Sequence, residues 1–214
     1  MNFNIIMLGP KGVAKTSMLT TMWDEISREN DIFIIKSTDE RKSYDLANKL
    51  AELKNIENFP SNMPIKEILQ GTDDLNSYPF SIHLKNDPKE LFSLNFFDHA
   101  GGIFAKGPQS SDYQQVVSTL KTSSVIIIPV DMTVMMELEE SDYYKFYNPQ
   151  LITNLISQNF GDSTNRLVII ALTKCEKYLK DSEETAKMIL RFKTIHSSML
   201  TALKNHDNNL LYCF

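Results

Sequence analysis

The sequence predicts a three-layer α/β fold in which a mostly parallel sheet, with one antiparallel edge strand, carries helices on both faces. Three observations predict it. Apolar runs typical of strands alternate along the chain with segments that have the spacing of helices. Two of these runs, Val125–Val130 and Leu167–Leu172, are apolar throughout, as expected of central strands buried on both faces. A third, Phe80–Lys85, alternates apolar and polar residues, which is typical of an edge strand with one face in water.

The elements expected first along the chain are a strand over Phe3–Leu8 and a helix over Thr16–Arg28. Residues 37–70 are predicted to be an insertion that holds a helix around Glu40–Leu53. This part of the chain therefore supplies one strand of the sheet and two helices.

An antiparallel hairpin is expected in the middle of the chain. Asn86–Lys89 reads as a turn because it contains Asn, Asp and Pro, and Leu91–Phe97 follows it as a strand. This strand pairs with Phe80–Lys85, so that one hairpin lies inside an otherwise parallel pattern.

The C-terminal part is expected to alternate the two central strands with helices. One helix is predicted over Asn148–Gln158 and another over Ser182–Asn205, where apolar residues recur at spacings of three and four. A further strand is predicted over Leu210–Phe214. Residues 132–147 form a second insertion, which is acidic and aromatic.

Composition places the chain among soluble globular proteins. Its 214 residues are enough for one α/β domain with a core, and 42% of them are hydrophobic and 23% charged. The net charge of −5 gives no support for binding to nucleic acid or to an anionic membrane surface. The 2 cysteines do not make a disulfide framework, and the apolar runs are too short to span a bilayer. We therefore expect a cytoplasmic protein with no nucleic-acid partner and no membrane insertion.

The strongest functional signal lies between the first strand and the first helix. Residues 9–16 read G-P-K-G-V-A-K-T, which is the phosphate-loop pattern G-x-x-x-x-G-K-[ST] with Ala14 in place of its last glycine. Glycines let backbone N–H groups turn inward around phosphates, while Lys15 reaches the terminal phosphates and the Thr16 hydroxyl ligates Mg²⁺. The alternative is a glycine-rich turn that only starts a helix. The predicted nucleotide-binding residues of this segment are Gly9, Lys11, Gly12, Val13, Ala14, Lys15, Thr16 and Ser17.

A second motif, D-H-A-G-G, follows the strand that ends at Phe97. Asp98 at a strand end can hold Mg²⁺, often through water, and Gly101 lets its backbone N–H approach a γ-phosphate. The alternative is an ordinary strand-end aspartate followed by a flexible turn, but the preceding phosphate loop favours the functional interpretation. His99 is expected to fill a variable position of this motif.

A third motif, T-K-C-E, follows the strand Leu167–Leu172. The three motifs together resemble the GTPase superclass of P-loop proteins, with a Ras-like topology and the P-loop NTPase fold, and the resemblance covers nearly the whole chain. The loop is also similar to those of bacterial GTPase-like domains. The base-recognition motif of the superclass is [NT]-K-x-D. The resemblance therefore implies that Thr173 and Lys174 lie at the base and that Glu176 stands where an aspartate accepts hydrogen bonds from guanine.

The resemblance also implies a threonine of the first switch that ligates Mg²⁺. Thr72, which follows Gly71 shortly before the hairpin, is the best-placed candidate, and a simple turn threonine is the equal alternative. A last base-contacting loop and a final helix are implied as well. Since the chain stops at Phe214, residues 1–214 are expected to be a single Ras-like GTPase domain truncated before that loop and helix.

Several positions depart from the pattern of the superclass. Ala14 puts a Cβ into a turn where a strained backbone costs about 1–3 kcal/mol. Lys11 is a long cation that would neutralise phosphate charge or block access. Gly102 stands where Ras-like members carry a water-positioning glutamine, and a glycine has no side chain to orient water. Glu176 carries its carboxylate one methylene further out than the expected aspartate.

We therefore expect a domain that binds GTP and GDP with Mg²⁺ and hydrolyses GTP slowly or not at all. It would act as a switch or regulatory module with an unidentified regulatory or effector protein. In hydrolysis, Lys15 would be the catalytic residue that stabilises the transferring phosphoryl group, and Thr16, Thr72 and Asp98 would hold Mg²⁺. Two alternatives remain open. One is a pseudo-GTPase that serves as a non-catalytic interaction scaffold, and the other is an ATP-binding P-loop protein.

Overall fold

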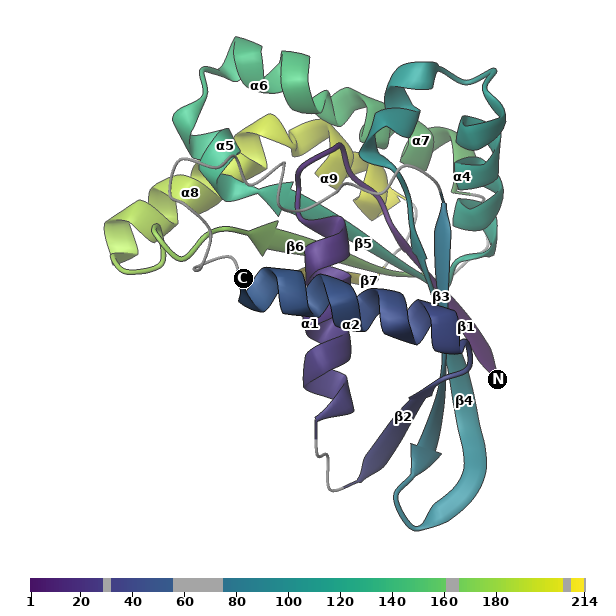
Figure 1. Cartoon of the computed structure of the whole chain (residues 1–214). Helices are drawn as coiled ribbons and strands as arrows, with labels where there is room; N and C mark the ends of the chain where they lie inside the picture. The colour runs from purple at the N-terminus through teal and green to yellow at the C-terminus, as the bar shows by residue number, and fades with distance from the viewer. Residues whose placement is uncertain (29–31, 56–74, 161–165, 206–208, 214) are drawn as a thin grey trace.

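The computed structural model describes residues 1–28, 32–55, 75–160, 166–205 and 209–213. Their strands form one seven-stranded sheet in the order β2-β3-β4-β1-β5-β6-β7 (Figure 1). Strand β3 runs antiparallel to both of its neighbours, and the remaining pairs are parallel. The strands are β1 Asn2–Met7, β2 Phe33–Ser37, β3 Asn76–Leu84, β4 Asp87–Asp98, β5 Val125–Asp131, β6 Leu167–Thr173 and β7 Asn209–Cys213.

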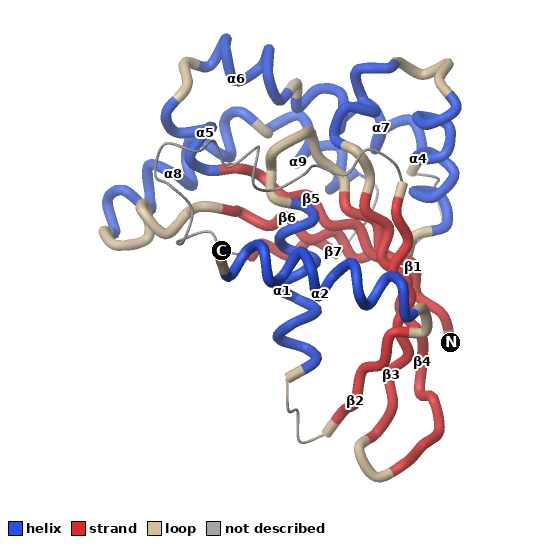
Figure 2. The backbone as a smooth tube through the Cα atoms, in the orientation of Figure 1, coloured by secondary structure: helices blue, strands red, loops and turns tan. Residues whose placement is uncertain are grey.

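Helices cover both faces of the sheet, which lies as one twisted layer between them (Figure 2). Helices α1 and α2 lie on one face, and the helices that follow β4 lie on the other (Figure 1). The predicted α/β fold with a mostly parallel sheet and helices on both faces is therefore confirmed. The helices are α1 Lys15–Ser27, α2 Glu40–Lys54, the 3₁₀ helix η2 Gly101–Lys106, α4 Ser111–Thr122, α5 Met132–Glu137, α6 Glu140–Tyr147, α7 Pro149–Asn159, α8 Ser182–Ile195 and α9 Ser197–Asn205.

The sheet separates two apolar cores because successive side chains of a strand point to opposite faces. On β1, Ile5 and Met7 pack with Leu19 of α1 and Leu46 of α2. The alternate residue Ile6 packs into the larger core on the other face, which is built from α4 to α9. This two-sided burial explains why the central strands read as continuous apolar runs.

The antiparallel strand of the predicted hairpin lies one position inside the edge of the sheet, because β2 covers it. Strand β2 was not predicted. It spans only five residues, and Phe33 and Ile34 are each more than a third exposed, so it lacks the apolar burial that marks the central strands. The hairpin turn is also shorter than predicted, since β4 already begins at Asp87.

The predicted helix over Ser182–Asn205 is two helices, α8 and α9, which are separated at His196. The apolar stripe continues across the break, and Met188, Phe192 and Met199 are all buried. His196 itself is buried, and its Nε2 lies 3.1 Å from the hydroxyl of Tyr143 on α6. One helix was predicted because the apolar residues keep their spacing of three and four on both sides of the break.

The acidic and aromatic segment 132–147 consists of the two short helices α5 and α6. Helix α5 begins after Asp131, whose side chain accepts a hydrogen bond from the backbone N–H of Val134. No helix in the described part of the chain is long and apolar enough to cross a membrane.

Candidate functional site

The segment between β1 and α1 forms an irregular loop with two left-handed residues. Gly12 has φ 89° and Ala14 has φ 67°, and α1 begins only at Lys15. Left-handed backbone favours glycine, so Ala14 holds the conformation that the missing glycine of the pattern would adopt. Left-handed residues in a short loop allow successive N–H groups to turn to one side, as they do in anion-binding loops.

Lys15 lies inside this loop. Its Nζ donates to the carbonyl oxygens of Gly9 and Pro10, both at 2.8 Å. Burial lowers the pKa of Lys15 to about 8, and the nearby charge of Asp98 opposes that shift. The ammonium is therefore held by backbone carbonyls at the centre of the loop, where a phosphate would replace them as its partner.

Thr16 and Asp98 lie side by side although 82 residues separate them. Strand β4 runs parallel to β1 and pairs Asp98 with Met7, which brings the end of β4 next to the loop. The Thr16 Oγ1 donates to Asp98 Oδ2 at 2.6 Å, and Asp98 is fully buried.

This pair of oxygens fits Mg²⁺. That ion accepts hard oxygen ligands and is bound through one or two protein groups together with substrate phosphates and water. No group of three or more His, Cys, Asp or Glu residues that could hold a metal exists within the described ranges. A site that depends on phosphate oxygens does not need one. The third predicted ligand, Thr72, lies outside the described residues.

The two glycines after Ala100 have different surroundings. A Cβ on Gly101 would come within 3.0 Å of the backbone of Pro10 and Lys11, which is closer than real side chains approach. The backbone at Gly101 therefore lies directly against the phosphate loop, as its predicted role requires. Gly102 is exposed, and a Cβ there would meet nothing within 4 Å.

His99 is buried between these groups. Neither of its ring nitrogens has a hydrogen-bond partner in the part of the chain that the structure describes. Burial, with a smaller contribution from the charge of Lys15, lowers the pKa of His99 to about 4. The ring is therefore neutral at pH 7 and has no contact with solvent that would let it act as a general base.

The third motif meets the phosphate loop at the ends of β5 and β6. Lys174 has φ 56°, and its Nζ lies 3.4 Å from the carbonyl oxygen of Gly12. The hydroxyl of Thr173 donates to the carbonyl of Val130 at 3.2 Å. Glu176 is exposed, and no hydrogen bond or ion pair joins it to another residue of the described ranges. Lys174 thus contacts the loop, while Glu176 is not held by a neighbour in the described part of the chain.

Asp131 lies beside Lys174 at this edge of the sheet and was not predicted. It is buried at the end of β5, pairs with Thr173 in the register, and forms an ion pair with Lys174 at 2.5 Å. The same carboxylate caps α5 through the N–H of Val134. Its signal in the sequence is the aspartate directly after the apolar run Val125–Val130, at the carboxyl edge where ligand sites of parallel sheets lie.

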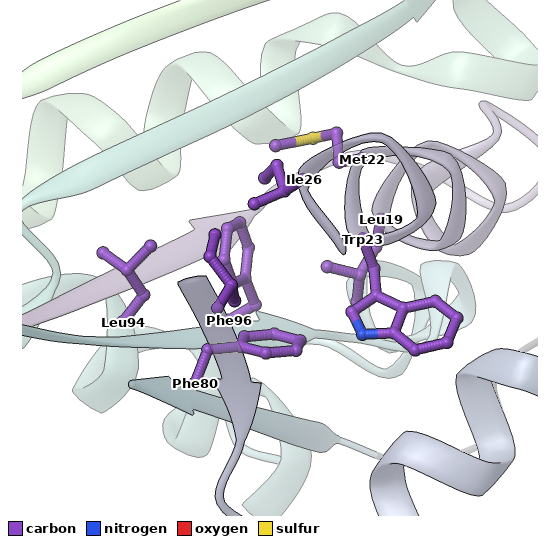
Figure 3. Close-up of a pocket in the computed structure, with 8 residues that line it drawn as sticks. Leu19, Met22, Trp23, Ile26, Phe80, Leu94 and Phe96 are labelled. Carbon is purple, nitrogen blue, oxygen red and sulfur yellow. The ribbon is translucent and has the colours of Figure 1, made fainter. Parts of the chain in front are cut away.

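An apolar contact holds α1, and with it Lys15 and Thr16, against the sheet. Figure 3 shows side chains of α1 converging with aromatic rings of β3 and β4. These side chains surround a cavity of about 10 Å³. This packing fixes the start of the helix relative to the end of β4. The cavity is lined by Leu19, Met22, Trp23, Ile26, Ile35, Phe80, Leu94 and Phe96.

Comparisons with known proteins identify a family and solved structures of similar fold. The family model described as Double-GTPase 2 matches residues 5–209. The Saccharomyces cerevisiae Ski7 GTPase-like domain, solved with GDP and inorganic phosphate, has a TM-score of 0.52 and 15% identity over 100% of this chain. The same domain bound to GTP also has a TM-score of 0.52 and 15% identity over 100% of this chain. At this identity the likeness is one of fold.

The chain spans less than half of those solved chains, 43% and 42% of their lengths. A small COPII coat GTPase, Sar1 from Encephalitozoon cuniculi in complex with GDP, has a TM-score of 0.43 and 9% identity. The match covers 99% of this chain and 68% of the Sar1 chain. No curated protein sequence matches at a significant level.

Proposed function

The chain belongs to the Double-GTPase 2 family, and from this premise we propose that it binds GTP and GDP with Mg²⁺, hydrolyses GTP slowly, and serves as a switch or regulatory module. The observation that carries the proposal is the junction of β1, α1 and β4. There Lys15 lies within the loop and Thr16 contacts Asp98 at 2.6 Å. A phosphate chain and its metal ion need these groups together.

Phosphate binding uses the loop and its lysine. On binding, Lys15 exchanges the carbonyls of Gly9 and Pro10 for phosphate oxygens, and the loop N–H groups add further donors. Thr16 and Asp98 are the residues that would hold Mg²⁺, and the bound ion supplies positive charge to the terminal phosphates. Lys15 stabilises the negative charge of the phosphoryl group during its transfer.

Base recognition uses the ends of β5 and β6. Lys174 is oriented by its ion pair with Asp131 and packs over the base, while Thr173 and Glu176 flank it. The Glu176 carboxylate accepts from guanine after it folds back from solvent. Ordering this side chain costs conformational entropy, which weakens the preference for guanine over adenine.

Hydrolysis is slow because the second motif places no side chain to orient water among the residues that the structure describes. Gly102 lacks one, and His99 is buried and neutral at pH 7. A regulatory or effector protein that supplies the missing group is therefore part of the proposal. The predicted cytoplasmic location and lack of a nucleic-acid partner stay predictions that rest on composition.

A second candidate is a non-catalytic scaffold. It is favoured by the left-handed backbone of Ala14 and by the exposed Glu176, which has no hydrogen bond or ion pair to the described part of the chain. The remaining candidate is an ATP-binding protein. It is favoured if Glu176 does not contact the base, because the site then has no carboxylate that selects guanine.

Equilibrium titration with fluorescent GTP, GDP and ATP, with and without Mg²⁺, separates the three candidates. We expect GTP and GDP to bind with Mg²⁺ and ATP to bind more weakly. The matched variant Thr16→Val, which removes the hydroxyl, should lose the Mg²⁺ dependence. Binding of ATP at equal or higher affinity would exclude guanine recognition, and binding of no nucleotide would support the scaffold.

A further inference from the structure

We propose that Lys11 contacts the terminal phosphate of a bound triphosphate and makes this site prefer triphosphates over diphosphates. The inference rests on the proposed function, because it assigns one part of the bound phosphate chain to this lysine. It is separable from base recognition, since it concerns only the phosphate tail.

The position of Lys11 follows from the approach of two segments. The backbone of Gly101 lies against the backbone of Lys11, so closely that a Cβ on the glycine would overlap it. A terminal phosphate that accepts from the N–H of Gly101 therefore lies next to Lys11. The neighbouring Gly102 leaves open space, because a Cβ there would meet no atom within 4 Å.

The charge of Lys11 is available for a ligand. Lys15 is held by two carbonyls, Lys174 by Asp131, and Lys106 by an aspartate of α4. Lys11 is exposed, and no hydrogen bond or ion pair joins its ammonium to another residue within the described ranges. Among these lysines it is the one that can turn to a ligand without breaking an internal contact.

The length of the phosphate chain decides whether a ligand gains affinity from Lys11. A lysine ammonium is a compact charge on a flexible four-carbon stem, with three donors for phosphate oxygens. A diphosphate lacks the group beside Gly101, so its binding does not use Lys11. The contact therefore raises the affinity for a triphosphate alone, by about tenfold for one charge-assisted hydrogen bond.

The test is calorimetric titration of the full chain and of Lys11→Met, which keeps an unbranched stem and removes the charge. The probes are GTP, GDP, inorganic triphosphate and inorganic pyrophosphate, all with Mg²⁺. Lys89→Met is the matched control, because Lys89 is exposed near the start of β4, at the opposite end of that strand from Asp98. Thermal unfolding of each variant establishes that it is folded.

We expect Lys11→Met to weaken the binding of GTP and of inorganic triphosphate about tenfold. The affinities for GDP and for pyrophosphate should change less than twofold. Three results would each overturn the inference: an equal loss of affinity for triphosphates and diphosphates, no loss of affinity for either, or a gain in affinity for GTP. If the wild type binds inorganic triphosphate selectively but neither GTP nor GDP, the proposed function fails while the role of Lys11 stands. If the wild type binds none of the four probes, both fail.

Discussion

Replacing Ala14 with glycine should stabilise the protein, because Ala14 is a left-handed residue at the start of α1 with φ 67° and ψ 26°. A residue with a Cβ brings that atom close to the following carbonyl in this conformation. Glycine has no such contact. The expected effect is a higher free energy of unfolding and a tighter complex with nucleotide, because the loop no longer holds a strained residue.

The magnitude is the difference between two opposing terms. Removing the left-handed strain gains about 1–2 kcal/mol. The greater freedom of glycine in the unfolded chain costs about 0.5–1 kcal/mol. At the midpoints of these two ranges the net gain is about 0.8 kcal/mol, which corresponds to a rise in melting temperature of roughly 2–3 °C for a chain of this size.

Urea unfolding followed by circular dichroism measures this difference. Ala47→Gly is the matched control, since Ala47 is exposed in the interior of α2, where the backbone is right-handed. The same substitution there should lower the free energy of unfolding by about 1 kcal/mol. The two variants are thus expected to change stability in opposite directions.

A loss of stability in Ala14→Gly equal to that in Ala47→Gly would refute the reasoning. It would mean that residue 14 is not left-handed in solution, so that the loop lacks the geometry on which phosphate binding depends. A gain in stability without any gain in nucleotide affinity would instead separate the strain at Ala14 from the binding step.

Three further predictions concern the site. Gly101→Ala should cost about 2 kcal/mol or more of unfolding free energy and abolish nucleotide binding, because its Cβ overlaps the phosphate loop. Gly102→Ala, measured beside it in urea, should be neutral, and equal effects would contradict the close approach of Gly101. Nucleotide affinity should fall about fourfold from pH 7 to pH 8.5, since the free protein loses the Lys15 proton near pH 8 and phosphate binds the charged form. Calorimetry in matched buffers checks this, and a flat profile would mean that the Lys15 pKa is not lowered. Glu176→Asp should raise the ratio of GTP to ATP affinity and Glu176→Ala should lower it, whereas one ratio in all three proteins would show that Glu176 does not read the base.

The sequence by itself determined the α/β class and the position of an irregular loop between the first strand and the first helix. Both are properties of short segments. Continuous apolar runs mark strands buried on both faces, and the pattern ending in Lys15 and Thr16 specifies one loop between one strand and one helix. Asp98 and Lys174 were predicted in the same way, because each follows a strand that its own apolar residues define.

Only the tertiary structure decided how these segments meet. The contact of Gly101 with Lys11, the pairing of Asp131 with Lys174, and the position of β2 at the edge all depend on sheet order and register. A local pattern contains no information about which distant segment becomes its neighbour. The break at His196 has the same origin, since the apolar stripe runs through it unchanged while its contact with Tyr143 comes from another helix. The roles proposed for Lys11 and Asp131 rest on such contacts, which form only when the parallel strands place their carboxyl ends together.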